Sequence, residues 1–129
     1  MKKLIQIILI IIIIYFIIFL YTSPEYYGNK KSPSQLSYIF NTFVPMFQEY
    51  NIPVNIFYGT LLGYVRENNF IDNDDDIDII LPIYYREKVL KLISDKKLQI
   101  NVINEYFIQI VTNNIGPFDI YFYKDITWL

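Results

Sequence analysis

The chain has 129 residues, with 11 basic and 13 acidic side chains, and it contains neither cysteine nor histidine. Without cysteine there is no disulfide framework and no thiol nucleophile, and without histidine the usual zinc ligand and the usual general base near neutral pH are absent. Any metal site must therefore use oxygen ligands, which favours Mg²⁺, Mn²⁺ or Ca²⁺. The excess of acidic residues argues against a general nucleic-acid-binding surface.

The N-terminal segment Leu4–Tyr21 carries no charge and is apolar apart from Gln6 and two tyrosines. As a helix it would span about 27 Å, close to the roughly 30 Å hydrocarbon core of a bilayer. We therefore predict an uncleaved membrane anchor over residues 1–21. A signal peptide is the alternative, but the apolar run exceeds the usual h-region and no A-x-A-like cleavage site follows. Lys2 and Lys3 abut the segment, which favours a cytoplasmic N-terminus.

Residues 22–33 are rich in proline, serine and charge, and we predict that they form a stalk. The folded domain would then occupy residues 34–129. Ser32 and Pro33 are typical of a helix N-cap and of the first helical position. The helix that follows is predicted to place five apolar residues on one face, namely Leu36, Ile39, Phe40, Phe43 and Phe47.

Beyond this helix, the periodicities predict an α+β domain with a mixed β-sheet and flanking helices. The expected elements are a strand at Val54–Tyr58, a helix from Gly59 to about Arg66, a strand at Ile77–Leu81 closed by Pro82, a helix over residues 84–95, a half-buried strand at Leu98–Val102, a strand at Tyr106–Thr112, a turn at Asn113–Pro117 and a last strand at Phe118–Tyr123.

An acidic cluster, NFIDNDDDIDII, runs from Asn69 to Ile80 and leads directly into a predicted strand. Side chains alternate between the two faces of a strand, so Asp76 and Asp78 should share one face while the isoleucines between and after them point into the core. Two carboxylates this close destabilise each other unless a proton or a cation lies between them. Mg²⁺ commonly binds one or two carboxylates together with substrate phosphates, so the pair predicts a metal site.

A third acid, Asp119, lies among core-type residues in the last predicted strand, FDIYFY. If that strand pairs with Ile77–Leu81, three carboxylates meet on one face. Upstream, Gly59 and Thr60 open a helix, where free backbone N–H groups and a hydroxyl can bind a phosphate, and Arg66 on the same helix could pair with it bidentately. A phosphate site beside a carboxylate cluster indicates phosphoryl or nucleotidyl transfer.

The run GTLLGYVRENNFIDNDDDIDI, Gly59 to Ile79, resembles the signature of the LicD/fukutin family, whose members typically read G-T-L-L-G-x-x-R, then F-I, then W-D-D-D-I-D-I. The resemblance implies a nucleotidyltransferase fold. Its implied metal ligands and catalytic acids are Asp76, Asp78 and Asp119, and its implied phosphate-side residues are Gly59, Thr60 and Arg66.

Members of this family move phosphocholine or ribitol phosphate from CDP-choline or CDP-ribitol onto glycans, and fukutin-type members are type II Golgi proteins. The resemblance therefore implies a membrane-anchored transferase that uses Mg²⁺ or Mn²⁺, a CDP-linked donor and a glycan acceptor, and that would reside in the ER or Golgi of a eukaryote. Asp72 and Asn73 replace the Pro-Trp that often precedes the acids. Family domains generally continue well beyond the third acid, so we expect a short or truncated member, incomplete at its C-terminus.

Other functions fit parts of the pattern. A non-catalytic, membrane-tethered nucleotide-binding or scaffold protein of the same fold is one, and a nucleotidyltransferase that uses an NTP is another. The aspartates at positions 72, 74 and 76 match the first three ligands of an EF-hand calcium loop, but Ile77 replaces the required glycine and Ile83 the bidentate glutamate. A solvated acidic turn with no ligand is the simplest alternative.

Overall fold

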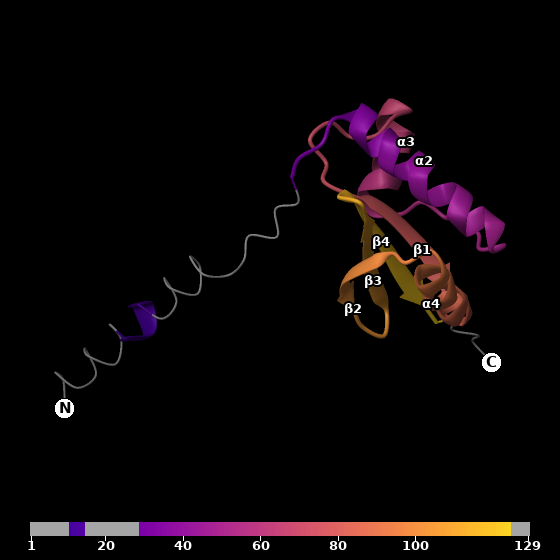
Figure 1. The fold of residues 1–129 in the computed structure, drawn as a ribbon. Coiled ribbons are helices and arrows are strands. Elements are labelled where there is room, and N and C mark those ends of the chain that lie inside the picture. Colours follow the sequence, from indigo (N-terminus) through magenta and orange to yellow (C-terminus); the bar gives the residue numbers. More distant parts are fainter. Residues whose placement is uncertain (1–10, 15–28, 125–129) are drawn as a thin grey trace, which may run out of the picture.

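The computed structural model describes residues 11–14 and 29–124 (Figure 1). The predicted anchor and most of the predicted stalk lie outside these residues, except for a short helical stretch at residues 11–14. Within the described ranges, no helix has the length and apolar character needed to cross a membrane. Residues 29–124 form the predicted α+β domain, with a mixed four-stranded sheet and flanking helices.

The sheet has the strand order β1-β4-β3-β2, in which β1 and β4 are parallel and the other pairs antiparallel. The first and last of the described strands, β1 and β4, therefore lie side by side in the sheet. The elements in chain order are α2 (Pro33–Glu49), α3 (Tyr58–Glu67), β1 (Ile77–Pro82), the 3₁₀ helix η1 (Ile83–Tyr85), α4 (Arg86–Asp95), β2 (Gln99–Ile103), β3 (Phe107–Thr112) and β4 (Ile115–Tyr123).

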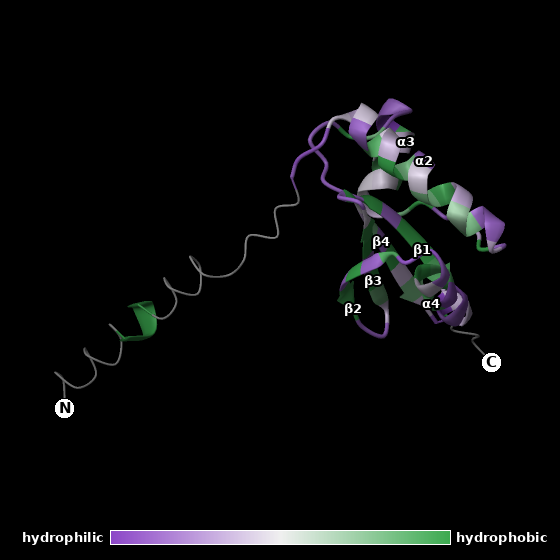
Figure 2. Cartoon of the chain, viewed as in Figure 1, coloured by the Kyte–Doolittle hydropathy of each residue, from purple (hydrophilic) through white to green (hydrophobic). Residues whose placement is uncertain are grey.

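Helix α2 begins where the sequence predicts. The Ser32 hydroxyl accepts a hydrogen bond from the Gln35 backbone N–H at 3.4 Å, and the Gln35 side chain accepts one from the Ser32 N–H at 2.9 Å, with Pro33 at the first helical position. This reciprocal capping box satisfies two N–H groups that a helix start otherwise leaves unpaired. Hydrophobic and hydrophilic positions alternate around the helix in Figure 2, and four of the five predicted apolar residues are buried, with Phe40 partly so.

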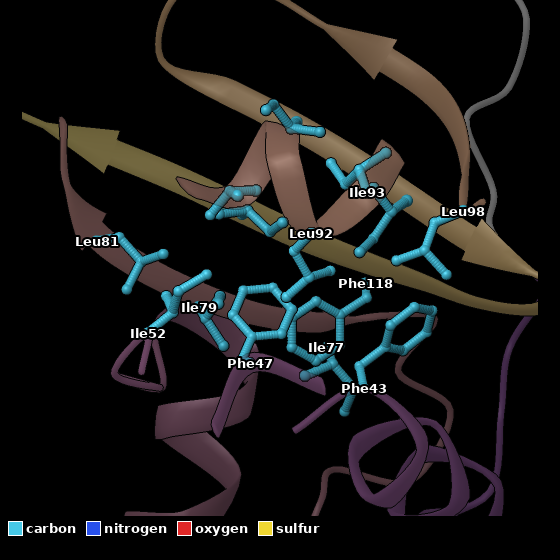
Figure 3. Close-up of a cluster of buried hydrophobic side chains, with 14 of the residues drawn as sticks. Phe43, Phe47, Ile52, Ile77, Ile79, Leu81, Leu92, Ile93, Leu98 and Phe118 are labelled. Carbon is cyan, nitrogen blue, oxygen red and sulfur yellow. The ribbon is translucent and has the colours of Figure 1, made fainter. Parts of the chain in front are cut away.

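The hydrophobic core lies between α2, α4 and one face of the sheet. Phe43 and Phe47 of α2 pack against Phe118 of β4, with ring centroids 4.9 and 5.4 Å apart (Figure 3). Full burial of each such side chain stabilises the folded state by about 1.5–3 kcal/mol. The two helices cover the face of the sheet to which the apolar strand residues point. The polar residues that alternate with them lie on the opposite face. That face carries Asp78 of β1 and Asp119 of β4.

Three of the predicted strands differ from the structure. Val54–Tyr58 does not form a strand: Ile56 makes one isolated bridge to Ile79, because the chain turns into α3 at Tyr58. Strand β2 is not half-buried, since Ile100 is 37% exposed, because β2 lies at the sheet edge outside the core. Strand β4 begins at Ile115, inside the predicted turn.

Gly63 of α3 packs directly against the chain that leads to the acidic loop. A Cβ at this position would lie 2.6 Å from the Asn69 carbonyl oxygen and 2.9 Å from the Ile71 nitrogen. Both are backbone atoms that cannot yield without moving the loop. Glycine at position 63 therefore fixes the distance between α3 and the loop that carries the acids.

We predict that Gly63→Ala lowers the free energy of unfolding by about 1–3 kcal/mol through overpacking, even though alanine is the better helix former by about 1 kcal/mol. The control is Val65→Ala on the same helix, whose side chain is 71% exposed and should change stability by no more than about 0.5 kcal/mol. Denaturant unfolding of the full chain in detergent measures both. Equal stability of the two variants would contradict the packing account.

Candidate metal centre

Three carboxylates meet on the face of the sheet opposite the core. Asp78 of β1 and Asp119 of β4 are direct partners in the parallel pairing, and Asp76 lies just before β1. One carboxylate oxygen from each residue can be chosen so that all three lie within 4.8 Å of one another. Asp78 and Asp119 are only 5% and 4% exposed, while Ile77 and Ile79 are fully buried in the core. The structure thus brings together the three acids proposed from the sequence.

The start of α3 supports Asp78. The Thr60 hydroxyl accepts the Asp78 backbone N–H at 2.9 Å, and the backbone N–H groups of Gly59 and Thr60 hydrogen-bond the Asp78 carboxylate. The positive end of the helix dipole adds to this stabilisation of a negative charge. Sequence reasoning assigned Gly59 and Thr60 to a phosphate; in the structure their polar groups face Asp78.

The backbone at this helix start is strained. Tyr58 has φ +37°, a left-handed value that is rare for a bulky residue and typically costs about 1–3 kcal/mol. The next residue, Gly59, lies against the acids: a Cβ there would lie 2.6 Å from an Asp74 carboxylate oxygen, which would have to move, and 3.5 Å from one of Asp78. The first N–H groups of α3 thus lie beside the Asp78 carboxylate, at the point where the backbone is strained.

Arg66 lies away from the acids, whereas Lys31 contacts the acidic loop. Arg66 is exposed in the last turn of α3, about 10 Å along the helix axis from Gly59, and it makes no ion pair with any residue that the structure describes. Lys31, which the sequence assigns to the stalk, instead pairs with the acidic loop. Its backbone bridges to Asp74, and its Nζ donates to the Asp75 carbonyl at 2.6 Å. No sequence signal distinguishes Lys31 from its neighbours.

Gln109 is a site residue that sequence reasoning missed. It is 6% exposed, pairs with Asp119 in the β3–β4 register, and donates from Nε2 to Asp119 Oδ1 at 2.9 Å. The signal was available: Gln109 is a polar residue between two core isoleucines, Ile108 and Ile110, which is the same alternation that identified Asp119. A carboxylate cannot donate when ionised, so this bond fixes which way the Gln109 amide points.

The family model of the LicD/FKTN/FKRP nucleotidyltransferase domain matches residues 51–127. The chain belongs to this family. The match spans α3, the acidic loop and all four strands, and therefore includes every residue of the carboxylate cluster. It confirms the resemblance seen in the sequence. No curated protein and no solved structure matches the chain.

In this LicD-family domain the acids repel one another. Burial is the main cause that raises the pKa of Asp76 to about 8, of Asp78 to about 7 and of Asp119 to about 6, and the neighbouring carboxylates raise them further. Hydrogen bonds from α3 and from Gln109 oppose part of the shift for Asp78 and Asp119. The cluster therefore retains protons near neutral pH unless a cation replaces them.

The donor set fits a hard divalent ion. Three carboxylates converge. The two nearly buried ones accept hydrogen bonds, Asp78 from the start of α3 and Asp119 from Gln109, and oxygen ligands of this kind suit Mg²⁺ or Mn²⁺. The group Asp74, Asp75 and Asp76 also has oxygens within 4.8 Å of one another. Asp72 is exposed and accepts a hydrogen bond from Asn73, which places it in the loop surface.

The raised pKa values predict a pH dependence of stability. The folded, metal-free chain binds protons more tightly than the unfolded chain, so the stabilisation from these acids is complete below about pH 4 and is lost as the pH rises through about 6 to 8. In EDTA the melting temperature should therefore fall between pH 5 and pH 8.5, and Mg²⁺ should restore it at the higher pH.

The matched variants are Asp76→Asn/Asp78→Asn, which should flatten this pH profile, and Asp72→Asn, which should leave it unchanged. Thermal unfolding across the pH range measures all three proteins. A melting temperature that rises over this interval in the unmodified chain would show that the acids are not mutually destabilised.

The support of Asp78 by Thr60 is tested separately. Thr60→Val keeps the shape but leaves the buried Asp78 N–H without its acceptor, so we expect a loss of about 1–3 kcal/mol in the free energy of unfolding. Thr60→Ser retains the hydroxyl and should recover most of that loss. If valine and serine behave alike in denaturant unfolding, the hydroxyl does not hold β1 in place.

Proposed function

We propose that this chain is a membrane-anchored, metal-dependent transferase that moves a phosphocholine- or phosphoalditol-type group from a CDP-linked donor to a glycan hydroxyl. The observation that carries the proposal is the convergence of Asp76, Asp78 and Asp119 within a LicD-family nucleotidyltransferase domain. In the reaction, the acceptor oxygen forms a bond to the donor phosphorus bearing the transferred group. The bond from that phosphorus to the oxygen bridging to CMP breaks, and the hydroxyl proton is released.

The charge balance supports a metal-bound diphosphate. Five aspartates lie within residues 72–78 and Asp119 joins them, whereas Lys31 is the basic residue whose side chain contacts this loop in the described part of the chain. A diphosphate would be repelled by such a surface. Mg²⁺ or Mn²⁺ held by Asp76, Asp78 and Asp119 would neutralise the diphosphate and stabilise the charge that develops on the departing CMP.

The hydrogen bonds suggest different roles for Asp78 and Asp119. The N–H groups of α3 hold the Asp78 carboxylate, which suits a fixed metal ligand. Gln109 donates to Oδ1 of Asp119, and the Asp119 carboxyl also hydrogen-bonds Asp76, so a bound ion would take the place of the proton that the two acids share. Gly59 and Thr60 then serve the phosphate indirectly, through Asp78. Arg66, two turns along α3, would reach only a more distant part of the donor.

The apolar segment Leu4–Tyr21 supplies the proposed anchor. With Lys2 and Lys3 on the cytoplasmic side, the protein would be single-pass with type II orientation, and the domain would act on glycans on the far side of the membrane. The proposed partners are thus the CDP-linked donor, a glycan or glycoconjugate, and the bilayer, with no nucleic acid.

We predict that Asp78→Asn reduces transfer at least about 10²-fold, as expected for loss of a group that stabilises transition-state charge, without lowering the melting temperature. The assay follows CMP release and product formation from CDP-choline and from CDP-ribitol, with the full chain in detergent and Mg²⁺ or Mn²⁺. Asp72→Asn, in the exposed part of the loop, should retain activity.

Activity in Asp78→Asn equal to that of the unmodified chain would refute the assignment. Metal-dependent binding of CDP without any transfer would instead favour the non-catalytic binding protein. Inhibition by UDP or ADP as strong as by CDP would favour a transferase that uses another nucleotide.

A further inference from the structure

A cavity of about 810 Å³ lies on the open face of the sheet, directly beside the carboxylates. We call it the amide trough and define it by five residues, Gln99, Asn101, Phe107, Gln109 and Tyr121. Asp76 and Asp119 line one end of the same cavity. The trough therefore opens onto the reacting centre from the β2–β3 side, whereas α3 supports that centre through β1.

The three amides of the trough form a directed chain of hydrogen bonds. Gln109 donates to Asp119 at 2.9 Å, so its oxygen faces Asn101, which donates to it at 3.4 Å; the Asn101 oxygen in turn accepts from Gln99 at 3.3 Å. The pairing is irregular between Ile100 and Val102, and Asn101 is the unpaired residue of this bulge. Bulges commonly re-aim side chains next to active sites.

The chemistry of the trough disfavours an anionic ligand and suits one that carries hydroxyls. None of the residues that line the cavity is basic, so nothing there matches a phosphate. Each amide retains donor or acceptor capacity beyond the chain of bonds that holds it. A hydroxyl both donates and accepts, and several hydroxyls on one carbon framework can therefore pair with consecutive amides.

The aromatic residues suit the same ligand. The rings of Phe107 and Tyr121 contact each other, with centroids 5.0 Å apart and planes tilted by 47°, so they form one wall. The β2 side of the cavity carries Gln99, Ile100 and Asn101 rather than a second ring. A nucleobase held between two planes does not fit this arrangement, whereas a sugar or alditol can place its C–H face on one wall and its hydroxyls on the other.

We infer that the amide trough binds the neutral polyhydroxylated group that accepts the transferred phosphate. It places a ligand hydroxyl next to Asp119, at the end of the hydrogen-bond chain. The role of acceptor rests on the proposed function, but the binding of a polyol in this trough does not depend on transfer.

The experiment is saturation-transfer difference NMR on the full 129-residue chain in detergent micelles with Mg²⁺. The probes are ribitol, galactose, N-acetylgalactosamine, cytidine and choline, each titrated to obtain a dissociation constant. The variants are Gln99→Ala, Phe107→Ala and their combination, and Ile103→Ala in the exposed end of β2 is the matched control. Mg²⁺-dependent binding of CDP is measured in parallel by calorimetry.

The inference predicts that at least one polyol or sugar probe binds, that the double variant weakens it about tenfold or more, and that Ile103→Ala does not. Absence of binding for ribitol, galactose and N-acetylgalactosamine alike in the folded chain would overturn it. So would a double variant that loses cytidine, CDP or choline instead, since the trough would then belong to the donor. Failure of CDP binding with polyol binding intact would count against the proposed function alone.

Discussion

The crowding of three carboxylates, two of them buried, is the constraint on which the rest of the site depends. Asp76, Asp78 and Asp119 place oxygens within 4.8 Å of one another, and two of these residues are nearly inaccessible to water. Burial disfavours the ionised form of each carboxyl and raises its pKa. Three contacts offset part of this cost. The N–H groups of α3 hydrogen-bond Asp78, the Gln109 amide donates to Asp119, and Lys31 donates to the backbone of the acidic loop. What remains uncompensated is a net negative charge, which a divalent cation would neutralise.

The sheet makes this arrangement possible by separating its two faces. Alternate residues of β1 and β4 fill the core between the sheet and the helices α2 and α4, which fixes the two strands (Figure 3). Asp78 and Asp119 occupy intervening positions of these strands, on the opposite face. The parallel pairing of β1 with β4 sets Asp78 beside Asp119, and the antiparallel β3 and β2 extend the open face with amides. A row of paired residues across the sheet, Asp78, Asp119 and Gln109, thus connects the proposed metal site to the amide trough.

Much of this could be predicted from the sequence, because alternation reports which face a strand residue occupies. The burial of Ile77, Ile79 and Phe118 followed from that pattern, as did the meeting of the acids once β1 and β4 were paired. The cap at Ser32 followed from local chemistry. Long-range contacts could not be predicted in this way. The pairing of Lys31 with Asp74 and the turning of α3 toward Asp78 depend on how distant segments pack, and the exposure of β2 depends on its place at the sheet edge.

The most direct test of the account is a calorimetric titration of the full chain, in detergent, with Mg²⁺ or Mn²⁺ in the presence and absence of CDP. The protein carrying Asp76→Asn/Asp78→Asn serves as the control. The account predicts that CDP binds only when the metal is present and that the control binds neither the metal nor CDP. Equal binding of CDP without metal, or in the control, would show that the aspartates do not form a nucleoside-diphosphate metal site.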